Sequence, residues 1–200
     1  MTIIEKRYNI KTFDEFSRDE QAEIIERHRY INIDDGFSLV EWNDSYVLSI
    51  EEKGFKNSKI YYDLSCSQGS GACFDSNDLD FNTLLKDFEC KHKQWIIDLL
   101  NDENYVSIQI EQNHYANHYT HSRTRNISLM YFRGLHICNR LQNLLEDVQS
   151  HIEKVYLDAC SDLYHNLQRD FDYLISNEAV KETLIANDYC FNEFSYKIEQ

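Results

Sequence analysis

The first stretch that could do chemistry is a polar, glycine-punctuated run, Ser67-Gln68-Gly69-Ser70-Gly71, which follows an aromatic segment. Glycines permit positive φ and expose successive backbone amides, which can form an anion-binding nest. The run lacks the lysine of a Walker loop, and it is too short for the G-x-S-x-G nucleophile elbow. We therefore expect a plain hairpin turn or a turn that contacts a ligand, and we expect no nucleophilic serine.

The second stretch is rich in histidine and arginine. His114, His118 and His121 have the i, i+4, i+7 spacing that would place three imidazoles on one helical face, as a zinc site requires. The stretch falls between two predicted strands and is rich in Asn, Tyr and Thr, so a long helix is disfavoured and we predict no metal ligand.

These residues could instead form an anion or nucleotide pocket together with the glycine run, or they could serve as structural hydrogen-bond and salt-bridge partners. The candidate pocket residues are Ser67, Gln68, Gly69, Ser70, Gly71, His118, Tyr119, His121, Arg123 and Arg125. The sequence predicts no catalytic residue and no cofactor.

A third group consists of carboxylates near the C-terminus. Paired carboxylates at helical spacing can hold Mg²⁺ or act as acid and base, but they can also form a solvated face or a face offered to a basic partner. The candidate partner-binding residues are Asp158, Asp162, Asp170, Asp172, Glu178 and Glu182.

The net charge is −15 and the isoelectric point is near 4.8. Residues 112–145 contain no Asp, Glu or Lys and carry four arginines, so the remainder of the chain carries −19. This balance argues against direct binding to bulk nucleic acid, because neutralising phosphates needs a basic face. An acidic surface could occupy a protein groove that is built for phosphates. Alternatively, the charge only keeps the protein in solution.

The elements that must position these residues follow from capping patterns and apolar spacing. Two capping boxes, Thr12 to Glu15 and Ser17 to Glu20, precede the first helix. Alternation at 105–111 is the clearest strand signal, and apolar steps of three and four predict one long C-terminal helix, with a possible break near Ser150 or Ser161. The predicted helices are 18–29, 37–53, 79–100, 136–175 and 176–186. The predicted strands are 58–66, 72–74, 105–111 and 125–132, followed by an extended tail over 191–198.

The sequence therefore predicts one α+β domain over residues 1–200, with a small antiparallel sheet of three to five strands packed against several helices. The six cysteines show no C-x-x-C pair, which favours a reduced cytoplasmic protein with free, mostly buried thiols. The sequence contains no apolar run of 18 residues, so it does not suggest a membrane role. The oligomeric state stays open.

Four segments carry a resemblance to a known family: TFDEFSRDEQAEIIERHRYIN (12–32), SQGSGACF (67–74), HYTHSRT (118–124) and LQRDFDYLISNEAVKETLIANDYCF (167–191). In this order they resemble a family of uncharacterised bacteriophage and prophage proteins, some of them labelled antitoxin-like. Family members usually have Asp where this chain has Ser70, and Ser where it has Thr120. The missing carboxylate implies that the turn serves recognition or structure here.

The resemblance implies a phage origin but no reaction. By analogy of class and charge, we expect a non-enzymatic accessory protein in the cytoplasm of the infected bacterial host. It would act as an acidic inhibitor, of the anti-CRISPR or anti-restriction type, of a basic nucleic-acid-handling or defence protein. The alternatives are a nucleotide- or anion-binding pocket protein, sequestering or enzymatic, and an antitoxin-like partner of a basic toxin.

Overall fold

The structure is a computed structural model, and it describes residues 9–33, 37–65, 69–102, 105–112, 120–131 and 138–199. The chain divides into two compact units. Unit 1 consists of residues 1–39 and 169–200, and unit 2 consists of residues 40–168. The single domain over 1–200 stays a prediction.

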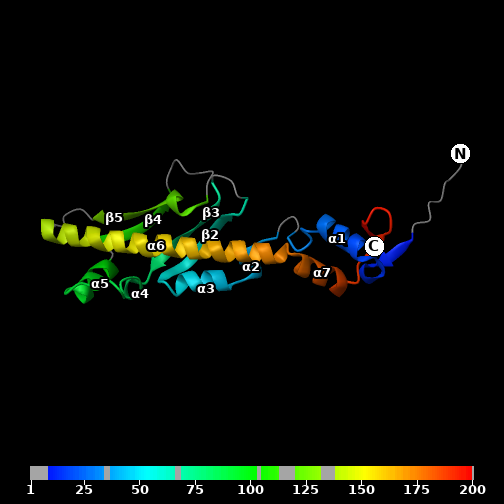
Figure 1. The fold of residues 1–200 in the computed structure, drawn as a ribbon. Helices are drawn as coiled ribbons and strands as arrows, with labels where there is room; N and C mark the ends of the chain where they lie inside the picture. The colour runs from blue at the N-terminus through cyan, green and yellow to red at the C-terminus, as the bar shows by residue number, and fades with distance from the viewer. Residues whose placement is uncertain are drawn as a thin grey trace, which may run out of the picture. The chain divides into compact units, whose positions relative to one another are not determined.

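Unit 2 contains two β-hairpins, short helices and most of one long helix (Figure 1). Its described elements are α2 (Leu39–Trp42, with Leu39 counted in unit 1), α3 (Ser45–Glu51), β2 (Phe55–Asp63), β3 (Gly71–Leu79), α4 (Phe81–Leu84), α5 (Lys93–Asn101), β4 (Val106–Gln112), the 3-10 helix η2 (Ser122–Thr124), β5 (Arg125–Tyr131) and α6 (Asn139–Leu174).

Both hairpins pair antiparallel. In the first, Ile60 lies opposite Phe74, and in the second, Ile108 lies opposite Leu129. The predicted neighbouring strands 105–111 and 125–132 are thus confirmed within one or two residues. The first hairpin is longer than predicted, because β3 continues well past Phe74 to Leu79.

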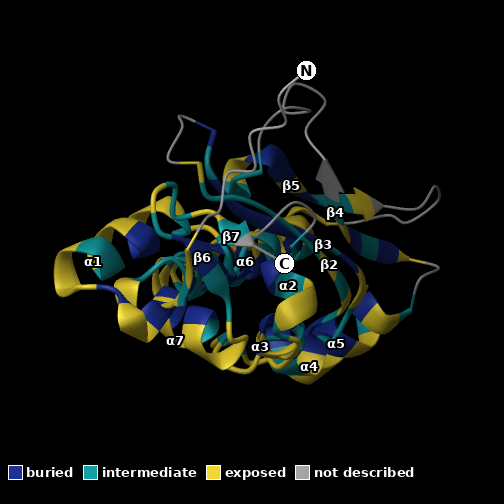
Figure 2. Cartoon of the chain, turned by 90° about the vertical axis from the view of Figure 1, so that its right-hand side faces the viewer, coloured by how far each residue is buried: buried dark blue, intermediate teal, exposed yellow. Residues whose placement is uncertain are grey.

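Helix α6 is the element on which unit 2 is assembled. In Figures 1 and 2, β4 and β5 lie on one side of α6 and α3 to α5 lie on the other. The Tyr156 hydroxyl donates to the Phe74 carbonyl of β3 at 2.9 Å, and Gln149 Nε2 donates to the Ile127 carbonyl of β5 at 2.7 Å. The helix is unbroken at Ser150, whose hydroxyl donates to the Glu146 carbonyl one turn earlier at 2.9 Å.

The predicted helix over 79–100 is wrong in its extent. Of the apolar residues that predicted this helix, Phe81, Leu84, Leu85 and Ile96 are buried, whereas Trp95 is exposed. The segment is divided between α4 and α5, because Asp80 caps a helix that ends after one turn and α5 begins only at Lys93. Periodicity records which residues are buried, but it does not record a change of direction between two short helices.

Unit 1 brings together the two ends of the described chain. Its elements are β1 (Ile10–Thr12), the 3-10 helix η1 (Phe13–Glu15), α1 (Arg18–Arg27), the last six residues of α6, α7 (Asn177–Ala186), β6 (Cys190–Asn192) and β7 (Ile198–Glu199). The three strands pair antiparallel in the order β1-β6-β7. The tail predicted as extended over 191–198 is therefore part of a small hairpin with a turn at its tip.

Local capping and a compact apolar core hold unit 1 together. Both predicted capping boxes are present, and Ser176 caps α7 by accepting from the Ala179 amide at 3.2 Å. The outward sides of α1 and α7 are exposed (Figure 2). The buried core residues are Phe13, Phe16, Ile24, Ile25, Val180, Leu184 and Phe191.

Polar contacts reinforce this core between segments far apart in sequence. Arg29 donates to the Ile175 carbonyl at 2.9 Å, and Asn32 Nδ2 donates to the Leu174 carbonyl at 2.8 Å. The Asn32 Oδ1 atom also accepts from the Thr183 hydroxyl at 2.6 Å. The α+β class, the antiparallel pairing and the long C-terminal helix are confirmed. The described strands form three small ladders, one of three strands and two of two.

Candidate functional site

The glycine run predicted as a turn lies at the end of the β2–β3 hairpin. Ser67 and Gln68 fall outside the described residues. Gly69 is buried, and the Ser70 hydroxyl lies 3.3 Å from that of Ser65. A hydrogen bond between these two hydroxyls therefore links the two sides of the turn.

Gly71 shows why a glycine stands where the turn ends. A β-carbon added at Gly71 would lie 2.6 Å from His121 Cβ and 2.8 Å from His121 Cα, which is closer than side chains can approach. Gly71 therefore lets the β2–β3 hairpin pack against the backbone before η2. The described end of the turn thus lies against His121, while His118 and Tyr119 lie outside the described residues.

His121 acts as the cap of η2. Its Nδ1 atom accepts from the Arg123 amide at 3.2 Å, and its carbonyl accepts from the Thr124 hydroxyl at 2.7 Å. Arg123 is exposed. Three of the predicted pocket residues, Gly71, His121 and Arg123, are therefore neighbours. The His121 Nδ1 atom is occupied by its hydrogen bond to the Arg123 backbone amide.

Arg125 has a different environment from Arg123. Its side chain is only 5% exposed, and its Nε donates to Asp75 Oδ1 at 2.5 Å. Its guanidinium also lies over the Tyr61 ring, 5.1 Å from the ring centre. Burial lowers the pKa of Arg125, but the hydrogen bond to Asp75 and the electrostatic influence of Asp75, Cys73 and Tyr156 together outweigh burial, so the pKa stays above its ordinary value. The positive charge of Arg125 is therefore balanced by Asp75 of β3.

A buried polar cluster that sequence reasoning missed lies behind Arg125. Thr124 Oγ1 approaches Cys73 Sγ at 3.6 Å, and burial raises the pKa of the Cys73 thiol. Burial likewise raises the pKa of Cys160 to about 12 and that of Tyr156 well above its ordinary value. These groups are protonated at neutral pH, so they pack and donate but do not attack. The i, i+4 spacing of Tyr156 and Cys160 on an apolar helix face was the signal available.

The thiols are free, as predicted, at the five cysteines within the described residues. Cys73 and Cys160 are buried, whereas Cys138 is exposed and Cys90 and Cys190 are half-buried. The prediction that most thiols are buried is therefore wrong for the described residues. A cysteine resembles a small apolar residue only where the surrounding fold happens to enclose it.

The six predicted partner-binding carboxylates divide between the units. Asp158 and Asp162 belong to unit 2, and both are exposed. The remaining four, Asp170, Asp172, Glu178 and Glu182, belong to unit 1, where Asp170 is half-buried beside Arg169 at 3.3 Å. Each unit thus carries its own acidic residues.

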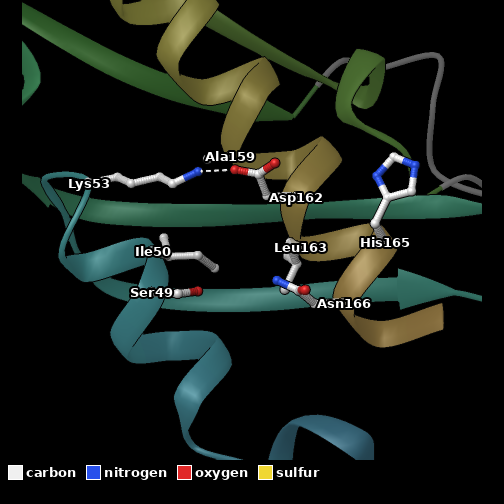
Figure 3. A pocket seen from close by; sticks show the side chains of 8 residues that line it. All are labelled: Ser49, Ile50, Lys53, Ala159, Asp162, Leu163, His165 and Asn166. Carbon is white, nitrogen blue, oxygen red and sulfur yellow. Dashed lines mark hydrogen bonds and ion pairs between the residues drawn. The ribbon is translucent and has the colours of Figure 1, made fainter. Parts of the chain in front are cut away.

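A hollow of about 410 Å³ opens between α3 and α6 in unit 2 (Figure 3). Buried Ile50, Ala159 and Leu163 line it together with Ser49, Lys53, Asp162, His165 and Asn166. Lys53 reaches from the turn after α3 to Asp162 on α6, where its Nζ donates to Oδ2 at 2.5 Å. The His165 Nδ1 atom is bonded to the Ser161 carbonyl at 2.7 Å. The paired charges cancel, so this hollow favours neither an anion nor a cation.

Among the described residues, no three His, Cys, Asp or Glu side chains gather as metal ligands could. His114 and His118 lie outside that part of the chain, so the three-histidine spacing stays untested. None of the helices in the described segments combines the length and apolar composition that crossing a bilayer requires.

Comparison with known proteins gives a family but no activity. No curated protein and no solved structure matches the chain. A family model described as a domain of unknown function, DUF8835, matches residues 39–177, which include all of unit 2 and the whole of α6. The chain therefore belongs to the DUF8835 family.

Proposed function

We propose that this protein is a non-enzymatic, phage-encoded accessory protein that inhibits a host nucleic-acid-handling or defence protein by occupying its basic groove. The observation that carries the proposal is the exposed side of α6 in unit 2. Between residues 141 and 168 the helix has five exposed carboxylates and a single Lys or Arg, Lys154. The carboxylates are Glu146, Asp147, Glu153, Asp158 and Asp162.

The fold holds these carboxylates on one side of a rigid element. The opposite side of the same helix is buried, with Leu145, Val148, Ile152 and Leu163 in the core. Lys154 lies among these five carboxylates and Lys53 pairs with Asp162. Residues 146 to 162 span about 24 Å at 1.5 Å per residue, so the net density is roughly one negative charge per 8 Å. Duplex DNA carries about one charge per 1.7 Å. The α6 side is therefore a sparse mimic, and we expect it to act by steering and by salt-sensitive contacts.

The chemistry of the glycine-turn region favours this reading over a nucleotide pocket or an enzyme. Arg125 is neutralised by Asp75, and the buried thiols and Tyr156 stay protonated. Arg123 is an exposed cation with which an anion pocket could still be built, but no second cation from the predicted set joins it in the described residues. Phage origin rests on the resemblance of the four sequence segments.

The test uses purified CRISPR effector nucleases and restriction endonucleases with labelled duplex DNA. At low salt the protein should displace the DNA from at least one of these nucleases, and it should lose this ability when the ionic strength shortens the Debye length from about 10 Å at 0.1 M to about 3 Å at 1 M. Reversing Glu146, Asp147, Glu153 and Asp158 to Lys should weaken displacement about tenfold or more.

The matched control reverses four exposed carboxylates elsewhere in unit 2, Asp44, Glu52, Asp87 and Asp98, and it produces the same change of net charge. It should retain most of the inhibition. Equal losses in both variants would reduce the effect to net charge, and failure to displace DNA from any nuclease at low salt would contradict the proposed function.

A further inference from the structure

The turn between β6 and β7 in unit 1 is unusually constrained for a surface loop near a chain end. Asn192 is 3% exposed, and its Oδ1 atom accepts from the amides of Phe194 at 3.0 Å and Ser195 at 3.1 Å. The Asn192 carbonyl accepts from the Tyr196 amide at 2.8 Å, and its own amide donates to the Lys197 carbonyl at 3.0 Å. The side chain of Asn192 therefore orders the turn at residues 194 and 195, and its backbone is bonded to residues 196 and 197.

Helix α1 holds the turn from a second direction. Arg27 donates to the Ser195 carbonyl at 2.9 Å and stacks its guanidinium over the Tyr196 ring, 5.3 Å from the ring centre. His28 Nε2 is hydrogen-bonded to the Tyr196 carbonyl at 2.8 Å. Tyr196 has φ of +48°, a left-handed backbone conformation that residues such as tyrosine adopt only where the surrounding structure imposes it.

The N-terminal strand region holds the turn from a third direction. The Glu193 amide donates to the Asn9 carbonyl at 3.2 Å, and the Glu193 carboxylate accepts from Asn9 Nδ2 at 2.9 Å. Lys11 Nζ lies 3.3 Å from the same carboxylate. The side chains of Glu193, Tyr196 and Asn192 are thus all engaged with neighbouring parts of unit 1.

Phe194 is the exception in this turn. Its side chain is 74% exposed, more than any other large hydrophobic side chain in the described residues. A single exposed aromatic residue is ordinary on a protein surface. Here, however, three sets of contacts order the backbone that carries it, so binding would have to freeze only the two side-chain torsions of Phe194. Pre-organised aromatic side chains of this kind make effective anchors in protein interfaces.

We propose that the β6–β7 turn presents Phe194 as an anchor that inserts into an apolar pocket of a basic partner protein. Unit 1 carries 16 acidic and 9 basic residues, a net charge of −7, which attracts a partner of positive net charge and disfavours stacking of Phe194 on nucleic acid bases. The class of the partner rests on the proposed function, whereas the anchor itself rests on the turn.

The experiment places a photo-crosslinking phenylalanine at position 194, and in a second protein at position 30, in phage-infected cells. Tyr30 is a suitable reference because it is another exposed aromatic residue of unit 1, at 61%. The protein crosslinked from position 194 is then purified, and its affinity for the unmodified chain, Phe194→Ala and Tyr30→Ala is measured at low and high salt.

We expect a crosslink specific to position 194 and a loss of affinity of about ten- to a hundredfold for Phe194→Ala, because burying a Phe side chain is worth about that much. The factor should persist at high salt, and Tyr30→Ala should bind within about twofold. Equal crosslinking from both positions, or unchanged affinity of Phe194→Ala, overturns the anchor.

The outcomes separate the two proposals. A nuclease that is inhibited equally well by Phe194→Ala supports the proposed function and overturns the anchor. A partner that depends on Phe194 but handles no nucleic acid supports the anchor and contradicts the proposed function.

Discussion

Two regions of the molecule both contain buried polar contacts, but these contacts have opposite effects on the residue that could bind a partner. Around η2 and β5 in unit 2, the side chain of Arg125 is buried and its charge is neutralised by Asp75. In the β6–β7 turn of unit 1, the polar groups of Asn192 and Arg27 also turn inward, but they bond backbone and leave Phe194 outside. Buried polar contacts can therefore occupy a candidate binding side chain, as at Arg125, or order the backbone that carries an exposed one, as at Phe194. The hydrogen-bond and ion-pair partners distinguish the two cases.

The largest expected effect compares the two arginines of the first region. Arg125→Leu should lower the free energy of unfolding by about 3 kcal/mol, because it removes the charged hydrogen bond from the buried guanidinium to Asp75 and the packing of the guanidinium over Tyr61. Arg123→Leu should change it by less than about 0.5 kcal/mol, because Arg123 is exposed. Urea denaturation of both variants measures the difference, and equal effects would mean that the two arginines are not distinguished as the structure indicates.

The next effect tests the close approach that brings the hairpin to η2. Gly71→Ala should destabilise the protein by about 2 kcal/mol, because the new methyl group would clash with the His121 backbone. Ser65→Ala in the same loop serves as the control and should stay within about 0.5 kcal/mol. Thermal or urea unfolding gives both values. A neutral Gly71→Ala variant would show that the two segments can separate without cost.

The corresponding test in unit 1 separates the support of the turn from the side chain that it presents. Asn192→Ala should cost about 1–2 kcal/mol, because the amides of Phe194 and Ser195 lose their acceptor. Phe194→Ala should cost less than about 0.5 kcal/mol, since its side chain is exposed. Hydrogen exchange at residues 194 and 195 should accelerate in the first variant only. Similar exchange in both variants would argue that Asn192 does not order the turn.

The smallest effect is the pH dependence of a helix cap in unit 2. The hydrogen bond from the Thr83 hydroxyl holds the pKa of Asp80 below its ordinary value of 3.8. Because the folded-state pKa is lowered, the stabilisation is complete above the unfolded-state pKa and is lost as the pH falls through the folded-state value. The stability advantage of the wild type over Asp80→Asn, less than about 1 kcal/mol, should therefore be present at pH 7 and vanish towards pH 2. An advantage that is constant with pH would contradict this assignment.

Short-range patterns predicted the fold well where one local rule decides the structure. The capping boxes at Thr12 and Ser17, the alternation in β4 and the three-and-four spacing of α6 all describe contacts within a few residues, and each appears as predicted. The predicted helix over 79–100 failed because the two short helices α4 and α5 share one apolar pattern. The close approach of Gly71 to His121 could not be predicted from local patterns, because it depends on how two segments distant in the sequence pack together.

The candidate residues divide in the same way. Sequence by itself determined the acidic balance, most of the helices and strands, and which residues could carry charge or hydrogen bonds, because these depend on composition and on neighbours along the chain. Only the tertiary structure decided that Arg125 pairs with Asp75 and that Cys73 and Cys160 lie in the core. It also decided that the Phe194 side chain is exposed on a turn ordered by Asn192 and Arg27. The physical reason is that burial and pairing join residues 50 to 168 positions apart, and no local pattern records such distances.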